Sequence, residues 1–337
     1  SYQTTGTGTF TNTGSFSSGT FIVGAGSNQT FVTTGVTTNA GALEMQGGTL
    51  QLNSTGTFSA SALTQTSGTS AITNLAGGSS QAFPSLVSTS GSLTMTNEAY
   101  PAQTVTLAGA NLSGSSSLTL DRVILLGGGS LLSTGGVNSF TNAEGAQAIA
   151  TLTVSSASTL NLTNSDLLNP IQVSNTTTSG GTTLAVSGGV TFGAGSGSSA
   201  LSGAVTLNNA TVTNEGSWVG PSLMNVVGSS SFDNTSGGSL TLPSLNLTAS
   251  SSLLLQSFGA TLDVTALSTA ASSTLSLGGS INFASGTSRT LGGALELQTA
   301  SFTNSGSLTA PTLVTATGTS SWTQQATAGS TGSMPLT

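Results

Sequence analysis

The chain has 337 residues and a formal net charge of −7, yet only 3% of its residues are charged; it contains two arginines and no lysine, histidine or cysteine. This inventory excludes a Ser-His-Asp triad and leaves no histidine or cysteine to ligate zinc. Two arginines cannot form a phosphate-binding patch, and the net negative charge would repel nucleic acid, so we expect no nucleic-acid partner.

The apolar residues argue against disorder. They make up 35% of the chain, whereas disordered chains are poor in apolar residues and rich in charge. No run reaches the ~18 apolar residues of a membrane span, so none is expected. The sequence starts at Ser1, with no charged segment followed by an apolar one, so we expect any signal peptide to have been removed. A lysine-free, hydroxyl-rich surface suits a secreted protein located outside the cell or on its surface.

Short strands are predicted from the N-terminus onward. In TFTNTGSFSSGTF (9–21) and GGTLQLNSTGTF (47–58), apolar residues alternate with polar ones, and Gly or Asn-x-Gly separates the runs. Alternation with a period of two predicts β-strands, and the intervening residues predict turns. Leu63 and Leu86 each end one of the similar triplets SAL and PSL, which is the first sign of a repeat.

Four carboxylates in the middle of the chain are separated by nearly the same step as Leu63 and Leu86. Glu98, Asp121, Glu144 and Asp166 follow one another at nearly equal steps, which match the step from Leu63 to Leu86. If they stack, their mutual repulsion must be relieved, either by Arg122 or by a bound Ca²⁺, which accepts clustered carboxylate oxygens. The third alternative is that they point apart in solvated turns. The sequence favours solvated turns, because three of the four follow an asparagine by one or two residues. Ca²⁺ is the one cofactor that these residues suggest. The segment 143–152, which contains Glu144, is the single helix candidate.

The second half repeats itself more clearly. TVTNEGSWVGPSL (211–223) returns as SFTNSGSLTAPTL (301–313), and LNLTASSSLLL (245–255) maps onto LSTAASSTLSL (267–277). A leucine recurs at a nearly constant interval, which is slightly longer at one step only. These leucines are Leu201, Leu223, Leu245, Leu267, Leu291 and Leu313. The asparagine of the phrase recurs at Asn12, Asn74, Asn142, Asn214, Asn234 and Asn304. The separation of the two phrases therefore corresponds to about four repeats.

A repeat of ~22 residues is long enough for three short strands and three turns. We predict an all-β fold, a right-handed parallel β-helix (β-solenoid) with coils of ~22 residues stacked about 4.8 Å apart. A sandwich or an up-and-down barrel is the alternative. One solenoid rod should span residues 1–323, with 324–337 as a flexible tail or linker. We expect Leu223, Leu245, Leu267 and Leu313 to stack in the core, the asparagines to form amide ladders, and prolines to mark corners.

The phrases GTFTNTGSF (8–16) and SFTNSGSLTAPTL resemble repeats of large bacterial exoproteins, namely autotransporter passengers and filamentous-haemagglutinin-like proteins. The resemblance implies a secreted parallel β-helix that acts as an adhesin or a surface fibre. In contrast to an intact autotransporter, we expect no membrane barrel at the C-terminus of this chain.

The function predicted from these features is structural. Neither terminus shows a capping helix or a run of charges, so we expect self-association through the solenoid ends into an extracellular fibre or surface layer. The alternative is a monomeric adhesin or glycan-binding rod, a fragment of a larger exoprotein that binds cell-surface glycans. We expect no enzyme, because polysaccharide cleavage would depend on the four carboxylates alone. A flat threonine array can bind ice, but Thr-apolar-Thr triplets at 104–106, 151–153 and 211–213 do not recur in every repeat.

Overall fold

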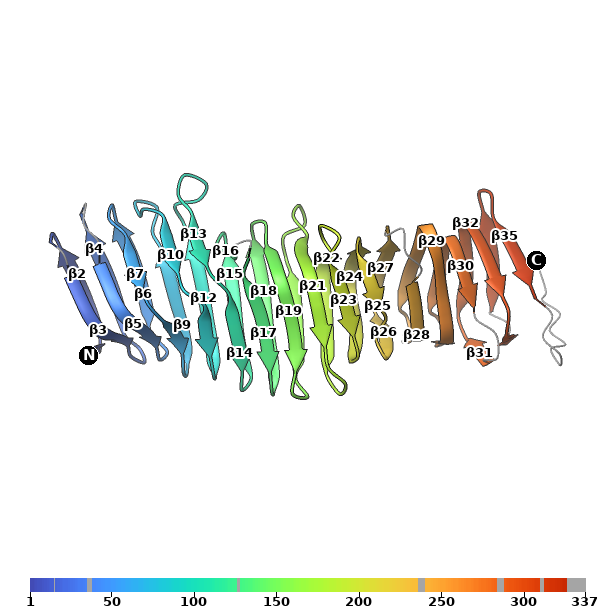
Figure 1. Cartoon of the computed structure of the whole chain (residues 1–337), viewed down its shortest axis with the longest axis horizontal. Coiled ribbons are helices and arrows are strands. Elements are labelled where there is room, and N and C mark those ends of the chain that lie inside the picture. The colour runs from blue at the N-terminus through green and yellow to red at the C-terminus, as the bar shows by residue number, and fades with distance from the viewer. Residues whose placement is uncertain are drawn as a thin grey trace. The chain divides into compact units, whose positions relative to one another are not determined.

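The computed structural model describes residues 1–14, 16–34, 38–125, 128–235, 240–283, 288–309 and 312–325. In this part of the chain there are strands and turns but no helix (Figure 1). Parallel strands stack on one another as in a β-solenoid, and the described residues make about 14 turns. The predicted fold class is therefore confirmed. The contacts divide the chain into two compact units, 1–171 and 172–337, which we describe separately.

Unit 1 consists of three stacks of parallel strands, because each turn of the chain contributes a strand to each stack. Stack A contains β1 (Tyr2–Thr4), the second half of β3 (Phe16–Val23) and of β5 (Thr38–Met45), β8 (Leu63–Gln65), β11 (Leu86–Ser88), β14 (Ala110–Ser113), β17 (Ser130–Thr134) and β19 (Ala148–Ser155). Stack B contains β2 (Thr7–Asn12), β4 (Asn28–Thr33), β6 (Thr49–Ser54), β9 (Thr69–Asn74), β12 (Gly91–Asn97), β15 (Ser116–Asp121), β18 (Val137–Glu144) and β20 (Thr159–Asn164). Stack C contains the first halves of β3 and β5 with β7 (Phe58–Ala60), and a separate three-stranded sheet of β10 (Gln81–Phe83), β13 (Val105–Leu107) and β16 (Ile124–Leu125).

Unit 2 also has three stacks, but its longer strands bend from one stack into the next. Stack D joins parts of β22 (Thr183–Phe192), β24 (Ala204–Asn214), β26 (Leu223–Val227), β28 (Leu240–Leu247), β29 (Ser252–Thr269), β31 (Ser288–Leu291) and β33 (Ser307–Thr309). Stack E joins other parts of β22, β24 and β29 with β27 (Ser229–Asn234), β30 (Thr274–Phe283), β32 (Ala294–Asn304) and β34 (Leu313–Thr317). Two further runs of paired strands complete unit 2. One run joins β21 (Ile171–Thr178), β23 (Ser198–Leu201) and β25 (Ser217–Val219). The other joins parts of β28, β29, β30 and β32 and ends with β35 (Ser321–Gln324).

Apolar residues at matching positions of successive turns form the core. In stack A, the expected correspondence of Leu63 with Leu86 is confirmed. Their column continues in both directions. It consists of Leu43, Leu63, Leu86, Ala110, Leu131 and Leu152, all of them buried. Burial of each leucine side chain contributes about 1.5–3 kcal/mol, so a column of this kind fixes the register of its strands.

The leucine column predicted in unit 2 is partly wrong. Leu245 does lie opposite Leu267, and Leu253 and Leu255 lie opposite Leu275 and Leu277 as expected. Leu223, however, lies opposite Ala204, and its neighbour Met224 takes the place opposite Leu245. Leu313 lies opposite Ala294 and is 49% exposed. The cause is the variable length of the turns, which the nearly constant leucine spacing conceals.

The repeated phrase also falls at different positions in the solenoid. Starting from Thr211, the strand pairs lead through Ser231, Leu254 and Ser276 to Glu296. The second copy of the phrase begins beyond that position, at Ser301. The first copy therefore starts in stack E, and the second starts in the stack that ends with β35. The phrase marks a strand, a bend and a corner, and it is used on more than one side of the solenoid.

Length differences between turns are taken up at the corners. Paired residues differ by 19 positions between Tyr2 and Phe21 but by 25 between Gly91 and Ser116. Gly91 has a φ of 83°, and a Cβ there would lie 2.3 Å from the carbonyl oxygen of Gly68 in the previous turn. Pro243 marks a corner within β28, as predicted for the prolines, because Leu242 and Ser244 pair with β29 and Pro243 does not. Pro311 and residues 326–337 of the predicted tail lie outside the described residues.

The helix candidate at 143–152 is wrong. Glu144 is the last residue of β18, and β19 begins at Ala148. Stacking between neighbouring turns therefore overrides the weak local helix preference of this segment. No helix in the described ranges is long and apolar enough to span a membrane.

Candidate functional site

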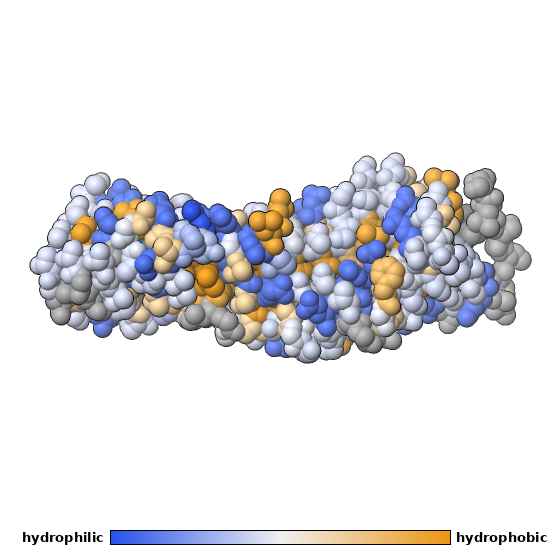
Figure 2. Space-filling view, turned by 90° about the horizontal axis from the view of Figure 1, so that it is seen from above, coloured by the Kyte–Doolittle hydropathy of each residue, from blue (hydrophilic) through white to orange (hydrophobic). Residues whose placement is uncertain are grey.

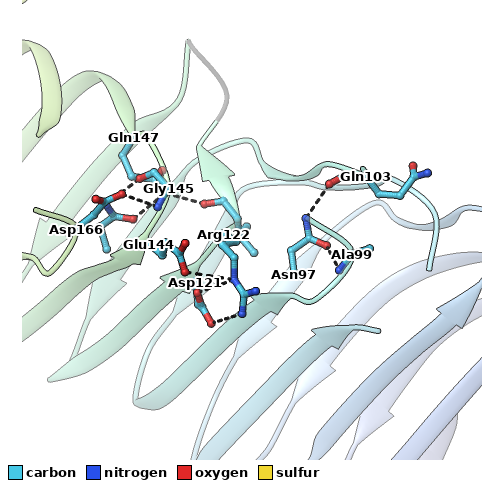
Figure 3. A network of polar contacts seen from close by, with 11 residues as sticks. Asn97, Ala99, Gln103, Asp121, Arg122, Glu144, Gly145, Gln147 and Asp166 are labelled. Carbon is cyan, nitrogen blue, oxygen red and sulfur yellow. Dashed lines mark hydrogen bonds and ion pairs between the residues drawn. The ribbon is translucent and has the colours of Figure 1, made fainter. Parts of the chain in front are cut away.

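The four carboxylates chosen from the sequence lie at one corner of unit 1, where the chain leaves stack B, and three of them, Asp121, Glu144 and Asp166, are labelled in Figure 3. Asp121 and Glu144 are the last residues of β15 and β18 and lie opposite each other across a register shift. Glu98 follows β12 by one residue, and Asp166 follows β20 by two. We call this corner, defined by these four residues and Arg122, the charged corner. Their shared spacing thus places all four carboxylates at one edge.

Arg122 connects two of the carboxylates. Its Nε donates to Oδ1 of Asp121 at 3.1 Å, its Nη2 donates to Oδ2 of Asp121 at 3.2 Å, and Nε lies 3.7 Å from Oε2 of Glu144. The backbone N–H of Arg122 also donates to the carbonyl oxygen of Glu144 at 2.7 Å. Arg122 adopts a φ of 57° at the register shift. The arginine therefore relieves the repulsion between Asp121 and Glu144.

The electrostatics of the corner favour the charged arginine. The hydrogen bond to Asp121 is the main cause that raises the pKa of Arg122, and the charges of Asp121, Glu144 and Glu98 add to it, whereas burial opposes them. Glu98 thus acts on the arginine through its charge. Since about 29% of the Arg122 side chain is exposed, water screens these interactions and the ion pair adds little stability.

The carboxylate of Asp166 is hydrogen-bonded mainly within its own loop. Its carboxylate accepts hydrogen bonds from the backbone N–H groups of Leu168 and Asn169, from the side-chain amide of Asn169, and from the backbone N–H of Gly145 in the previous turn. These bonds, led by the one from the Asn169 side chain, lower the pKa of Asp166. The carboxylate is thereby committed to holding the loop that presents Leu167 and Leu168, which are 94% and 88% exposed.

At this corner the structure places Arg122 beside Asp121 and Glu144. Within the described ranges, no group of three or more Asp, Glu, His or Cys side chains is placed to hold a metal ion. Calcium binding by Glu98, Asp121, Glu144 and Asp166 stays a prediction.

Buried asparagines support the bends next to the charged corner (Figure 3). The side-chain amide of Asn142 donates to the carbonyl oxygen of Gly145 at 2.9 Å and to the side-chain oxygen of Asn164, one turn on, at 2.8 Å. Asn97 likewise donates to the carbonyl oxygen of Gln103 and receives a bond from Asn74. Asn214 and Asn234 repeat the arrangement in unit 2. The predicted amide ladders are confirmed. They follow from inward side chains at strand ends, without left-handed backbone at these asparagines.

A second feature, which the sequence analysis missed, is a regular array of hydroxyl groups on the outer side of stack B. The inward Leu and Met residues of these strands alternate with outward polar ones. Two outward columns run through β9, β12, β15, β18 and β20. They consist of Ala71, Thr94, Thr119, Thr141 and Thr163, and of Thr69, Ser92, Ser117, Ser139 and Asn161. We call these ten residues the hydroxyl face.

The hydroxyl face is uncharged and regular. Its strands lie about 4.8 Å apart, and its columns lie about 6.6 Å apart along each strand. In the described part of the chain, the hydroxyls of Thr94, Thr119, Thr141 and Thr163 make no hydrogen bond, so they are available to a ligand or to water. Matching of outward residues across turns would have found this face. A search for Thr-apolar-Thr triplets does not find this face, because each of its strands contributes only one threonine to it.

The third feature is the open edge of the N-terminal turn. Among the described strands, β1 pairs only with β3, β2 only with β4, and the first half of β3 only with β5. Tyr2 is 48% exposed, and Phe10 and Phe16 are partly exposed. These three rings cluster, with centroids 6.5 Å apart for Tyr2 and Phe10 and 4.8 Å apart for Phe10 and Phe16. The turn therefore presents unpaired backbone and an aromatic surface together.

Comparison with protein-family models, with curated proteins and with solved structures found no match. The fold class therefore stands on the structure alone, and the resemblance to autotransporter passengers and filamentous-haemagglutinin-like proteins stays a prediction.

Proposed function

We propose that this chain is a secreted structural protein whose copies join end to end through open strand edges to form an extracellular fibre or surface layer. The observation that carries the proposal is the N-terminal turn, in which β1, β2 and the first half of β3 each have one described partner strand and an aromatic cluster is exposed. Unpaired strand edges are templates for pairing with another chain, and proteins that stay monomeric usually block them with charge or proline. β1 and β2 contain neither.

The distribution of charge supports the same function. Residues 1–43 and 297–337 contain no charged side chain, although the whole chain has a net charge of −7. Two copies can therefore meet at the strands within these ranges without burying a charged side chain, while repulsion between the charged middle parts disfavours side-by-side aggregation. The surface visible in Figure 2 is mostly hydrophilic or intermediate, with separate hydrophobic areas. This surface suits a protein that stays dispersed except at specific contacts.

The test is the state of the purified chain as a function of concentration, measured by sedimentation velocity and negative-stain microscopy. We expect fibres or sheets to form as the concentration rises. Gln3→Lys in β1, an exposed position, should prevent assembly, whereas Asn53→Lys, an exposed position in β6 with partner strands on both sides, should not. A stable monomer at high concentration in every buffer would exclude this function.

The hydroxyl face favours a second function, a monomeric adhesin or glycan-binding rod. Neutral sugars are recognised through hydrogen bonds with hydroxyl and amide groups, and this face offers them in a fixed array. We expect sedimentation with an insoluble neutral polysaccharide, weakened by the combined Thr94→Val, Thr119→Val and Thr141→Val substitutions. These changes keep the branched shape and remove only the hydroxyls. Thr153→Val in stack A, also directed outward, is the control. Equal sedimentation of all variants would contradict this function.

A further inference from the structure

We infer that copies of the chain join head to tail, with the β35 edge and Trp322 of one copy packed on the Tyr2, Phe10 and Phe16 cluster of the next. This inference rests on the proposed end-to-end assembly and names its contact. We call this contact the aromatic joint. It specifies which ends meet and which side chains become buried, and neither follows from assembly alone.

On the N-terminal side, the inward side chains of the first turn lack a covering layer among the described residues. Tyr2 lies opposite Phe21 and stacks on it with ring centroids 5.3 Å apart. Phe10 lies opposite Phe31 with centroids 4.8 Å apart. Phe21 and Phe31 are each 1% exposed because they have a turn on both sides. Tyr2 and Phe10 occupy the same columns one layer further out, and no described strand covers their outer sides.

On the C-terminal side, the inward column also ends in an aromatic ring. Trp322 lies opposite Phe302, with centroids 4.6 Å apart and an edge-to-face angle of 80°. In the neighbouring strand β34, Ala316 lies opposite Leu297. Leu297 is 3% exposed, whereas Ala316 is exposed. No described strand pairs with the outer edges of β34 and β35. Among the described residues, this layer therefore also lacks a covering strand on its outer side.

The geometry of the strands favours head-to-tail contact. Every pairing within each unit is parallel, and a head-to-tail contact continues this pattern in the next copy. Two N-terminal edges facing each other would instead have to pair antiparallel, in a closed dimer that cannot grow. Aromatic rings in contact gain stability beyond their buried area when they meet edge to face or offset. Neither edge contains a charged side chain, so a second copy of this chain can cover it without burying one.

A mixing experiment tests the direction of the joint. Tyr2→Lys blocks the N-terminal edge and Ala316→Lys blocks the C-terminal edge, each with one added charge. Under the head-to-tail arrangement each variant alone is monomeric, and an equal mixture forms dimers that cannot grow, because one intact head meets one intact tail. If heads join heads, Ala316→Lys alone forms dimers, and this outcome would overturn the inference. Asn53→Lys, with the same added charge away from both edges, should assemble like the native chain.

Tryptophan fluorescence tests the contact itself. Trp218 is 8% exposed and lies between Phe192 and Phe232, so the Trp218→Phe variant leaves Trp322 as the single reporter. On assembly we expect a blue shift of the emission and a loss of quenching by acrylamide. Fibres in which Trp322 stays fully quenchable would overturn the aromatic joint but leave the proposed function intact. Absence of any assembly in the native chain would instead exclude the proposed function, and the aromatic joint with it.

Discussion

Individual buried asparagines stabilise the structure because each one forms hydrogen bonds both within its own bend and with the next turn. Asn142 is completely buried, and it bonds to Gly145 within its bend and to Asn164 in the next turn. Its side-chain oxygen also accepts a bond from Gln147. Like charges at this position in successive turns, about 4.8 Å apart, would repel one another. Amides do not, because each donates on one side and accepts on the other.

The substitution Asn142→Ala should therefore lower the free energy of unfolding by about 1–3 kcal/mol, because it leaves buried polar groups without partners. Urea denaturation followed by circular dichroism measures this change. Asn161→Ala, on the outer side of the same stack, provides the comparison and should change stability by less than about 0.5 kcal/mol. Equal effects of the two substitutions would show that the amide ladder is not a source of stability.

Asp166 gives the molecule a pH dependence of known sign. Because its pKa is lowered in the folded chain, its stabilising effect is present in full above the ordinary carboxyl pKa. The effect is lost as the pH falls through the lowered value. We expect Asp166→Asn to be less stable than the native chain at pH 7, and the difference to shrink as the pH is lowered to about 2. Urea midpoints at both pH values measure it. A difference that does not change with pH would contradict the assignment.

At the scale of strands and turns, the stacks keep strict register while the corners vary in length. The alternation of apolar and polar residues was sufficient to predict strands, turns and a solenoid, because burial in parallel stacks requires that alternation. It was insufficient to place Leu223 and Leu313. A turn shortened by one residue exchanges inward and outward side chains, and an average spacing does not reveal where this happens.

The candidate sites were predictable to different degrees, because the sequence shows the spacing of residues but not the register of the strands. The nearly equal spacing of Glu98, Asp121, Glu144 and Asp166 was visible in the sequence, and it brought them to one corner. Their partners were not visible, because the bend at Arg122 and the loop at Asp166 depend on local hydrogen bonds. The hydroxyl face was hidden because its threonines recur at unequal intervals along the chain. Only the register of the strands aligns them.

Insertions distinguish corners from strands. One glycine inserted between Gly180 and Gly181, in the exposed turn between β21 and β22, should cost less than about 1 kcal/mol, because loop length has a weak effect on stability. The same insertion between Thr94 and Met95 would turn the inward residues after it toward solvent. We expect that variant to lose most of its cooperative unfolding transition, measured by urea denaturation. Similar tolerance at both positions would contradict strict register in stack B.

For the molecule as a whole, charge contributes little to folding. Within the described residues, the ion pairs are those of Arg122 with Asp121 and Glu144, and both are partly exposed. Apolar columns and hydrogen bonds supply the rest of the stability. We therefore expect the free energy of unfolding to change by less than about 1 kcal/mol between low salt and about 0.5 M NaCl, since surface ion pairs are weak and screened. Urea unfolding at several salt concentrations measures this. A larger loss of stability with salt would show that the charged corner matters more than its geometry indicates.

The two arginines have a consequence for proteolysis. Proteases of the trypsin type cut after lysine or arginine, so Arg122 and Arg289 mark the only two bonds available to them. Val123, which follows Arg122, is completely buried, and Arg289 itself is completely buried in β31, where its guanidinium bonds to Asn304 and to the carbonyl oxygens of Val264 and Thr265.

Cleavage at either bond requires local unfolding first. The native chain should therefore remain intact on gels under conditions in which the urea-unfolded chain is cut into three fragments, as two cleavage sites require. Rapid cleavage of the folded chain at Arg122 would show that the charged corner opens readily. A chain almost without basic residues is protected by its composition from this class of protease, and the fold covers the two bonds that composition leaves.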